Sequence, residues 1–447
     1  MSAHTFSDRP FEEAAARRAV LERAGRTLIA GLLVAGLGLF FLVSSMTLYH
    51  FGIDYEAAGG NFIGKLHPGS WLIFAAFVLK LIGSGNPIGV LDKILGRQPG
   101  TFLFLIAWTV LLAQAVLVQK LPFTPLIDTF LMPVVLVTLL RDASAPLKAD
   151  LAIMLHLLFA ANATLAIFEY ATGFRLVPFV AGTFVVEHDW RSTALFGHPL
   201  LNAMLAGCYI IALAMGGGSD LPKPMRALAM GLQLVAMVAF GGRSAFVLLA
   251  PFLIYGLARQ ALPVLRGTQR LNIGAFGLGV LLVPLLLAAV ALALEKGLLD
   301  RFLLRFVNDN GSAEARLILL HMFSVIPMSD LLLGPDQNFV HILEVKGGIV
   351  YGLESLWLGF FITYGILVSL VFFTGLFAFC ADVLAFTQRG SVAVLLFFFI
   401  VASTSVSLGA KTVEFGMVCA LMMIFLRPAH KASTRLPYTG VGKSTGS

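Results

Sequence analysis

Apolar runs of about 17 to 25 residues recur along the chain, and this is the length that a helix needs to cross roughly 30 Å of hydrocarbon. A chain segment in hydrocarbon must satisfy its own backbone hydrogen bonds, so such runs fold as helices. The composition agrees, because 58% of the residues are hydrophobic and 12% are charged, against roughly 25% charged in a soluble domain. The sequence therefore excludes a soluble globular protein and predicts an all-α, polytopic integral membrane protein.

The apolar runs predict about twelve transmembrane helices and a simple domain organisation. The predicted spans lie near 27–49, 69–83, 101–119, 123–140, 150–171, 194–215, 225–241, 243–261, 272–294, 355–380, 391–408 and 411–427. Residues 1–26 form an N-terminal tail, 27–427 a single transmembrane domain, and 428–447 a disordered C-terminal tail. Within the transmembrane domain, residues 295–354 form one large loop.

The distribution of positive charge predicts which side each loop faces. Cytoplasmic loops collect Lys and Arg, and an N-terminus inside the cell places the majority of the 31 basic residues in the cytoplasm. Both tails are then cytoplasmic and the large loop is periplasmic. The net charge of +7 is explained by this topology and by anionic membrane lipids, so no nucleic-acid partner is predicted.

The large periplasmic loop is itself predicted to contain short helices. Apolar residues recur at helical spacing at Leu299, Phe302, Leu303 and Phe306, which is typical of an amphipathic helix lying on the membrane surface. A second helix is expected over Ala313 to Ile326 and ends before Pro327.

Arginine at the periplasmic ends of the spans runs against the charge bias, and it is the first candidate for a site. Five such residues are Arg175, Arg191, Arg243, Arg305 and Arg316. A guanidinium stays charged and offers a planar fork to phosphate oxygens, so these residues are candidate ligands of a pyrophosphate. The alternative for each of them is pairing with lipid phosphate or snorkelling to the interface.

Two further side chains near these arginines are candidates for the site. His198 lies in a Gly-His-Pro turn that starts a span, where an anion could dock, and Glu354 lies at the mouth of the span after the large loop. A carboxylate in apolar surroundings can accept a proton from a hydroxyl. The alternative for Glu354 is a helix N-terminal charge that offsets the dipole, and for His198 an ordinary helix-start residue.

The order of these segments resembles the O-antigen ligase and polymerase superfamily, the Wzy-type and ligase-type enzymes of bacterial surface polysaccharide assembly. The similarity extends over roughly residues 175–370. It rests on three segments: Arg191 to Asn202, Gly241-Gly242-Arg243-Ser244, and Glu314-Ala315-Arg316 leading to Leu333-Gly334.

The resemblance implies a bacterial inner-membrane glycosyltransferase without metal or cofactor. Its donor would be a glycan linked to an undecaprenyl-pyrophosphate-type lipid, transferred to a hydroxyl of another lipid-linked unit, with a flippase and a chain-length regulator as partners. The arginines would hold the pyrophosphate. The chain has Glu354-Ser355 where the ligases carry His-Asn. This departure favours Glu354 as the base, with His341 in the large loop and His198 behind it, and an exopolysaccharide polymerase as the function.

Three other functions stay open from the sequence. A ligase that attaches finished glycan to lipid or protein uses the same donor. A metal-dependent glycosyltransferase would use Asp54 and Glu56, although such a pair more often caps a turn. A secondary transporter or exporter would use Glu169, or Glu414 paired with Lys411. Cys208, Cys380 and Cys419 all lie in apolar runs and suggest neither disulfides nor a metal site.

Overall fold

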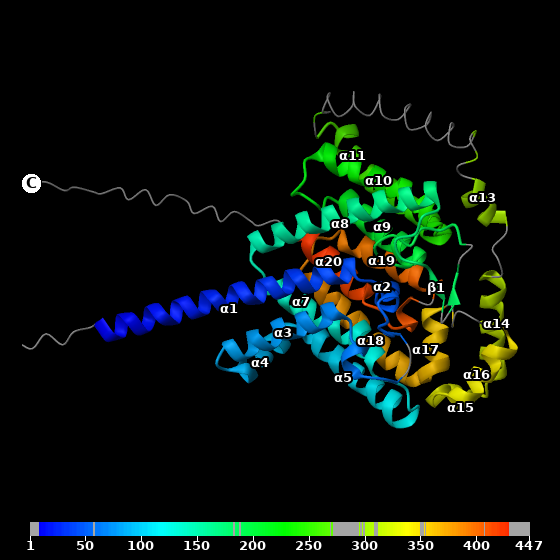
Figure 1. Cartoon of the computed structure of the whole chain (residues 1–447), viewed down its shortest axis with the longest axis horizontal. Helices are drawn as coiled ribbons and strands as arrows, with labels where there is room; N and C mark the ends of the chain where they lie inside the picture. The colour runs from blue at the N-terminus through cyan, green and yellow to red at the C-terminus, as the bar shows by residue number, and fades with distance from the viewer. Residues whose placement is uncertain are drawn as a thin grey trace, which may run out of the picture.

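A computed structural model of the protein is almost entirely helical (Figure 1). The structure describes residues 9–56, 59–181, 184–186, 189–268, 270, 295, 297, 300–307, 312–348, 353, 355–405 and 407–428. The predicted span 272–294, the residue Glu354 and the C-terminal tail from residue 429 lie outside these ranges.

The first half of the chain contains eight α-helices in the described ranges. They are α1 (Arg9–Leu42), α2 (Ser45–His50), α3 (Pro68–Gly83), α4 (Pro87–Arg97), α5 (Pro99–Ala113), α6 (Thr124–Leu126), α7 (Met132–Asp142) and α8 (Ala145–Thr172). Three short segments of other helix types join them: the 3₁₀ turn η1 (Phe62–Lys65) and the π-helical η2 (Gln114–Val118) and η3 (Ile127–Leu131).

A short hairpin separates the two halves of the chain. Its strands, β1 (Val180–Ala181) and β2 (Phe184–Val185), have two residues each. The later helices are α9 (Pro199–Ala214), α10 (Lys223–Phe240), α11 (Arg243–Leu265), α13 (Asp300–Val307), α14 (Ser312–Val325), α15 (Met328–Leu333), α16 (Gln337–Lys346), α17 (Leu356–Tyr364), α18 (Ile366–Ala385), α19 (Ser391–Ala402) and α20 (Glu414–Phe425), with the 3₁₀ turn η4 (Ser407–Gly409) before the last. The predicted loop helices are confirmed as α13 and α14, and α14 ends before Pro327 as expected.

Seven helical segments in the described ranges are long and apolar enough to cross a membrane, and eight if α3 and α4, bent by 113° at Ser84–Asn86, are one span. The segments are Glu22–Leu42, Pro99–Val118, Thr124–Asp142, Ala145–Thr172, Lys223–Phe240, Arg243–Leu265 and Ile366–Ala385. The shorter apolar helices α9, α19 and α20 add to them. The helical membrane class is therefore confirmed, whereas the count of twelve stays a prediction. The predicted span 355–380 is not one helix, because Gly365 divides it into α17 and α18.

The helices form a bundle with two ends (Figure 1). At one end α13 to α16 form an arc, together with the hairpin and the loop between α8 and α9; we call this the arginine end because Arg191 and Arg243 lie there. At the other end, which we call the distal end, α1 begins and Lys80 of α3 pairs with Asp142 of α7 at 2.5 Å. The short turn between α9 and α10 meets the end of α20 there, through the Gly218 N–H and the Phe425 carbonyl.

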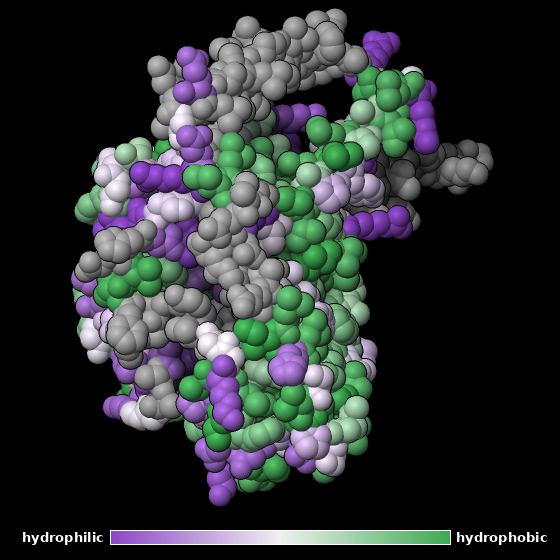
Figure 2. Space-filling view, turned by 90° about the vertical axis from the view of Figure 1, so that its right-hand side faces the viewer, coloured by the Kyte–Doolittle hydropathy of each residue, from purple (hydrophilic) through white to green (hydrophobic). Residues whose placement is uncertain are grey.

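Three apolar clusters form among the described residues: a large one, a small one, and a minor one of Met46, Val177 and Val180 beside the hairpin. The large one surrounds α9 and α20, which bury almost every side chain, and close helix contacts depend on small residues: a side chain added at Gly375 of α18 would collide with Ala107 of α5. The small one joins α14, α15 and α16 to α17 through Leu319, Leu331, Val340 and Ile362. Figure 2, which looks onto the arginine end, shows extensive hydrophobic surface there beside clusters of hydrophilic side chains.

Candidate functional site

The loop that carries Arg191 is fixed by the buried carboxylate of Glu169, in the last turn of α8. Its Oε2 atom accepts hydrogen bonds from the Ser192 hydroxyl at 2.6 Å and from the backbone N–H groups of Thr193 at 3.1 Å and Ala194 at 3.0 Å. Its Oε1 atom accepts from the Leu176 N–H at 3.0 Å. Four donors satisfy the buried charge and hold the loop, including Ala194 with its unusual φ of 41°. Glu169, a transporter candidate from the sequence, therefore anchors this loop.

Two asparagines extend the same scaffold. The Asn162 side chain donates to the Asn202 Oδ1 atom at 2.8 Å and accepts from the Leu195 N–H at 2.9 Å. Asn202 in turn donates to the carbonyls of Thr193 at 2.8 Å and His198 at 3.1 Å. The amide of Asn202 thus holds the chain between Thr193 and His198.

Arg191 is oriented by Asp189, an acidic partner that the sequence analysis did not consider. The guanidinium Nε atom donates to both carboxylate oxygens, at 3.0 and 2.8 Å, and Nη2 donates to Oδ2. The Arg191 backbone N–H also bonds Oδ1 at 2.9 Å, and both side chains are largely buried. These bonds fix the orientation of the Arg191 guanidinium. Its Nη1 atom makes no hydrogen bond to the described residues. Asp189 and Arg191 are separated by one residue, and this spacing was the sequence feature from which the pair could have been predicted.

The Arg191 loop packs directly on the turn that precedes Arg243. The Ser192 N–H bonds the Ala239 carbonyl at 3.0 Å, and the space beside Gly241 is filled by Trp190 and by the methylene stem of Arg191. A Cβ atom on Gly241 would lie 2.9 Å from the Trp190 ring and 3.0 Å from Arg191. Gly241, with φ of 63°, is thus required for the contact between the two loops. Trp190 and Arg191 occupy the space beside this glycine, so no ligand enters there.

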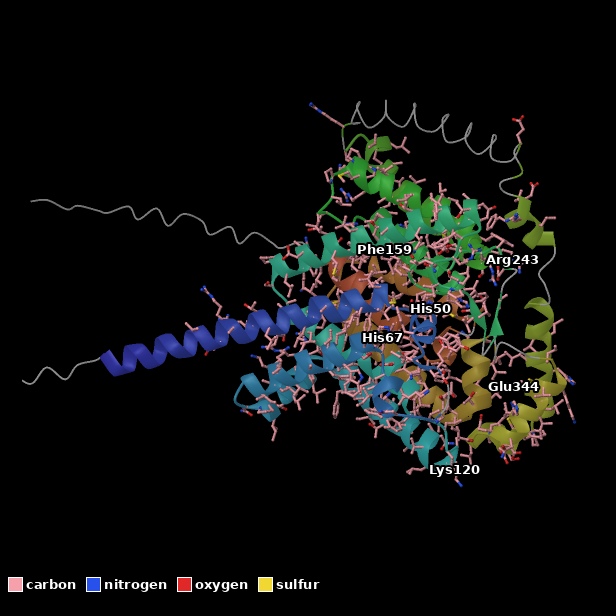
Figure 3. The ribbon with its side chains drawn as sticks, in the orientation of Figure 1. His50, His67, Lys120, Phe159, Arg243 and Glu344 are labelled. Carbon is pink, nitrogen blue, oxygen red and sulfur yellow. The ribbon has the colours of Figure 1, made fainter. Side chains whose placement is uncertain are left out.

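Arg243 begins α11 at the arginine end, next to the start of the large-loop helices (Figure 3). The helix α13 packs here, because Phe302 meets Phe246 of α11 with ring centroids 5.3 Å apart. Arg301 of α13 lies within electrostatic range of Tyr170, whose ring meets Trp190 at 5.7 Å. Arg191, Arg243 and Arg301 therefore belong to one neighbourhood. Arg305 and Arg316 lie in α13 and α14, with side chains outside the described part of the chain.

Arg175 stabilises the same loop through hydrogen bonds to three backbone carbonyls. It donates to the Glu169 carbonyl at 3.2 Å, to the Phe174 carbonyl at 3.1 Å and to the Asp189 carbonyl at 3.0 Å. Its guanidinium thus bridges the end of α8 and the residue that orients Arg191. Arg175 was predicted as a pyrophosphate ligand, and these bonds give it in addition a role in loop structure.

His198 lies beside Arg191 with the Phe179 ring as a shared neighbour. The Phe179 ring is 5.4 Å from the His198 ring and 5.5 Å from the Arg191 guanidinium carbon. The His198 Nδ1 atom accepts from the Leu200 N–H at 3.3 Å and so caps α9. Burial, and then the charge of Arg191, lower the His198 pKa to about 4. The imidazole is therefore neutral at pH 7.

Of the other two predicted proton-transfer residues, His341 lies away from this cluster. His341 lies on α16, exposed, with its ring 3.6 Å from the Glu344 carboxylate. Figure 3 shows Glu344 on the same helix well apart from Arg243. Glu354 lies outside the described residues, although its neighbours Leu353 and Ser355 are described and come directly before α17.

A second buried polar centre, which the sequence analysis did not predict, holds the first loop at the arginine end. Asp128 of η3 is fully buried and accepts from the Tyr55 hydroxyl at 2.8 Å, the Ser70 hydroxyl at 2.6 Å and the His67 N–H at 2.9 Å. Burial raises the pKa of Tyr55 well above its usual value, and Asp128 adds to the effect. Asp128 is a lone carboxylate within the apolar run 123–140, and this feature of the sequence could have predicted a buried polar centre.

Lys411 completes this centre from the segment before α20. Its ammonium donates to the carbonyls of Tyr55, at 2.8 Å, and Lys65, and lies 4.0 Å from the centre of the Tyr55 ring. Burial lowers its pKa to about 8, with Asp128 acting in the opposite direction. Lys411 was expected to pair with Glu414, whereas its hydrogen bonds go to the first loop. Among the described residues no three His, Cys, Asp or Glu side chains form a metal-binding group.

Comparisons of the chain with protein-family models, with characterised proteins and with solved structures give no match. The fold by itself defines the class: this is a helical protein in which at least seven of the described helical segments are long and apolar enough to span a membrane.

Proposed function

We propose that this protein is a bacterial inner-membrane polysaccharide polymerase that acts on a glycan linked to a polyprenyl pyrophosphate. The observation that carries the proposal is the packing of the Arg191 loop against Gly241, which joins two of the predicted pyrophosphate-binding segments at one end of the bundle. These segments are almost fifty residues apart in the sequence, so no local pattern enforces their contact. A guanidinium group whose orientation is already fixed can bind the oxygens of a diphosphate at a membrane surface with its planar fork.

The proposed reaction is a substitution at the anomeric carbon of the donor glycan. A hydroxyl oxygen of the acceptor attacks this carbon and forms the new glycosidic bond, while the bond from the carbon to the pyrophosphate oxygen breaks. The hydroxyl proton passes to a base, and the polyprenyl pyrophosphate leaves with its additional negative charge. Arg191, Arg243 and Arg316 stabilise that charge as it develops.

Glu354 is the proposed base, and His198 is the second candidate. His198 is favoured by its place beside Arg191, but its Nδ1 lone pair already accepts from the Leu200 N–H, so it takes up a proton only after that bond opens. Asp189 is assigned a positioning role, because it touches the Arg191 guanidinium and holds its direction.

The test is complementation of a deletion strain with Arg191→Ala, Arg243→Ala, Arg316→Ala or Glu354→Gln, followed by electrophoresis of the polymer. We expect each variant to lower the amount of full-length polymer at least tenfold, because each arginine variant loses a charge-stabilising donor and Glu354→Gln loses the base. Arg243→Lys should also be impaired, because an ammonium does not reproduce a bidentate fork. Arg266→Ala, at the distal end of α11, is the matched control.

Normal polymer from all four variants, at wild-type protein levels, would refute the assignment of the site. A deletion strain that makes polymer of normal length but detached from its anchor would identify a ligase instead of a polymerase.

A secondary transporter or exporter is the second candidate function, and the buried Asp128 in a π-helical segment is the observation that favours it. Against a carrier role, three donors already satisfy Asp128. If this function is the correct one, the deletion strain accumulates full-length polymer inside the cell.

A further inference from the structure

A groove between α11 and α19 lies at the distal half of the bundle, away from the arginine cluster. Its volume is about 660 Å³, within the range of about 300–1,000 Å³ typical of ligand pockets. Most of its lining is apolar, with Leu248 and Phe252 on α11 and Leu396 and Ile400 on α19. Two cationic side chains, Arg259 and Arg389, also line it.

The two arginines mark one end of the groove. Arg259 is about 24 Å along α11 from Arg243, so the two residues lie near opposite ends of this candidate membrane span. Arg389 lies in the turn between α18 and α19, and its neighbour Gly390 packs on Met215 at the end of α9. Both α11 and α19 then lead from these arginines toward the middle of the bundle, where Leu248 and Ile400 line the groove.

Both guanidinium groups lack a protein partner among the described residues. In the part of the chain that the structure describes, neither Arg259 nor Arg389 has a side-chain hydrogen bond or ion pair, and both are exposed. Tyr255, also in the groove lining, supplies an amphipathic ring of the kind found at membrane interfaces. The two arginines complement an anionic headgroup. The apolar part of the groove complements the acyl chain that is joined to this headgroup.

We propose that this groove is a binding site for an anionic phospholipid of the leaflet at the distal end. Its phosphate lies between Arg259 and Arg389, and one acyl chain lies along α11 and α19. This site is independent of the proposed polymerase reaction, because it shares no residue with the arginine end.

The test measures lipid affinity of the delipidated full-length protein in detergent, by native mass spectrometry. The probes are phosphatidylglycerol and phosphatidylcholine with identical acyl chains. We expect the wild type to prefer phosphatidylglycerol, and the double variant Arg259→Ala/Arg389→Ala to bind it about 30-fold more weakly, from about 1 kcal/mol for each lost cation. Ala393→Phe, which fills the groove and keeps both arginines, should weaken both lipids.

The matched control removes two exposed cations from α4, Lys93→Ala/Arg97→Ala, and should leave the affinity unchanged. Equal affinity for the two lipids, or wild-type affinity in the double variant, overturns the proposal. So does protection against thermal unfolding by inorganic phosphate that equals the protection by phosphatidylglycerol, because a site for a free anion needs no apolar groove.

Discussion

Buried ionisable side chains in this protein are satisfied by backbone groups as much as by opposite charges. Glu169 takes three of its four hydrogen bonds from backbone N–H groups, and Lys411 donates to two carbonyls. Such bonds tie a charge to a particular loop conformation, since the backbone must present its polar groups at one place. Arg191 and Asp189 instead pair side chain to side chain, which leaves the direction of the guanidinium dependent on one residue.

His198 gives a prediction about pH. Its pKa of about 4 in the folded protein lies below the usual 6.5, so between these values the unfolded chain binds more protons and stability falls as the pH falls. We expect a loss of about 1–2 kcal/mol in the free energy of unfolding at pH 5. His198→Asn keeps a capping acceptor for α9 without titrating. Thermal unfolding of both proteins at pH 7.5 and pH 5 tests this; parallel behaviour would contradict it.

At the scale of elements, glycine determines where helices stop and meet. Gly365 separates α17 from α18 with φ of 87°, and Gly334, with φ of 100°, ends α15 directly against it. A Cβ atom on Gly365 would overlap the backbone of Leu333 and Gly334. The two glycines therefore bring the large loop onto the start of a membrane-spanning helix, with Gln337 bonding the Thr363 carbonyl at 3.1 Å beside them.

Gly365→Ala should lower the free energy of unfolding by about 2 kcal/mol or more, because the new side chain is both strained and overlapping. Gly231→Ala within α10, where the space is open, is the control and should be neutral or slightly stabilising. The measurements are thermal unfolding and proteolysis of the loop between α14 and α16. Equal melting temperatures for the two variants would show that the backbone contact is unimportant.

At the scale of the whole molecule, the arginine end is assembled from loops that are remote in the sequence. The centre around Asp128 and Lys411 joins the first loop, α3, η3 and the segment before α20, while Glu169 joins α8 to the loop before α9. The distal end carries the groove of Arg259 and Arg389. The two ends of the bundle thus differ in chemistry.

The coupling of Asp128 and Lys411 can be measured by a double-mutant cycle. Asp128→Asn and Lys411→Met should each cost about 1–3 kcal/mol, because each removes buried hydrogen bonds that hold the first loop. The double variant should lose clearly less than the sum. Lys80→Met, in the exposed pair with Asp142, is the control and should cost at most about 1 kcal/mol. Additive losses at Asp128 and Lys411 would exclude the coupling.

The sequence by itself determined the helical membrane class and the loop helices α13 and α14, because hydrocarbon length, helical period and proline stops act within one segment. Only the tertiary structure decided which partners the charged residues have. Asp128 meets Tyr55 across 73 positions, and Lys411 meets Tyr55 across 356. It likewise decided that the apolar run 355–380 is divided at Gly365, since Gly334 fills the space there. Such contacts depend on how helices are arranged in space, and no local pattern of residues encodes that arrangement.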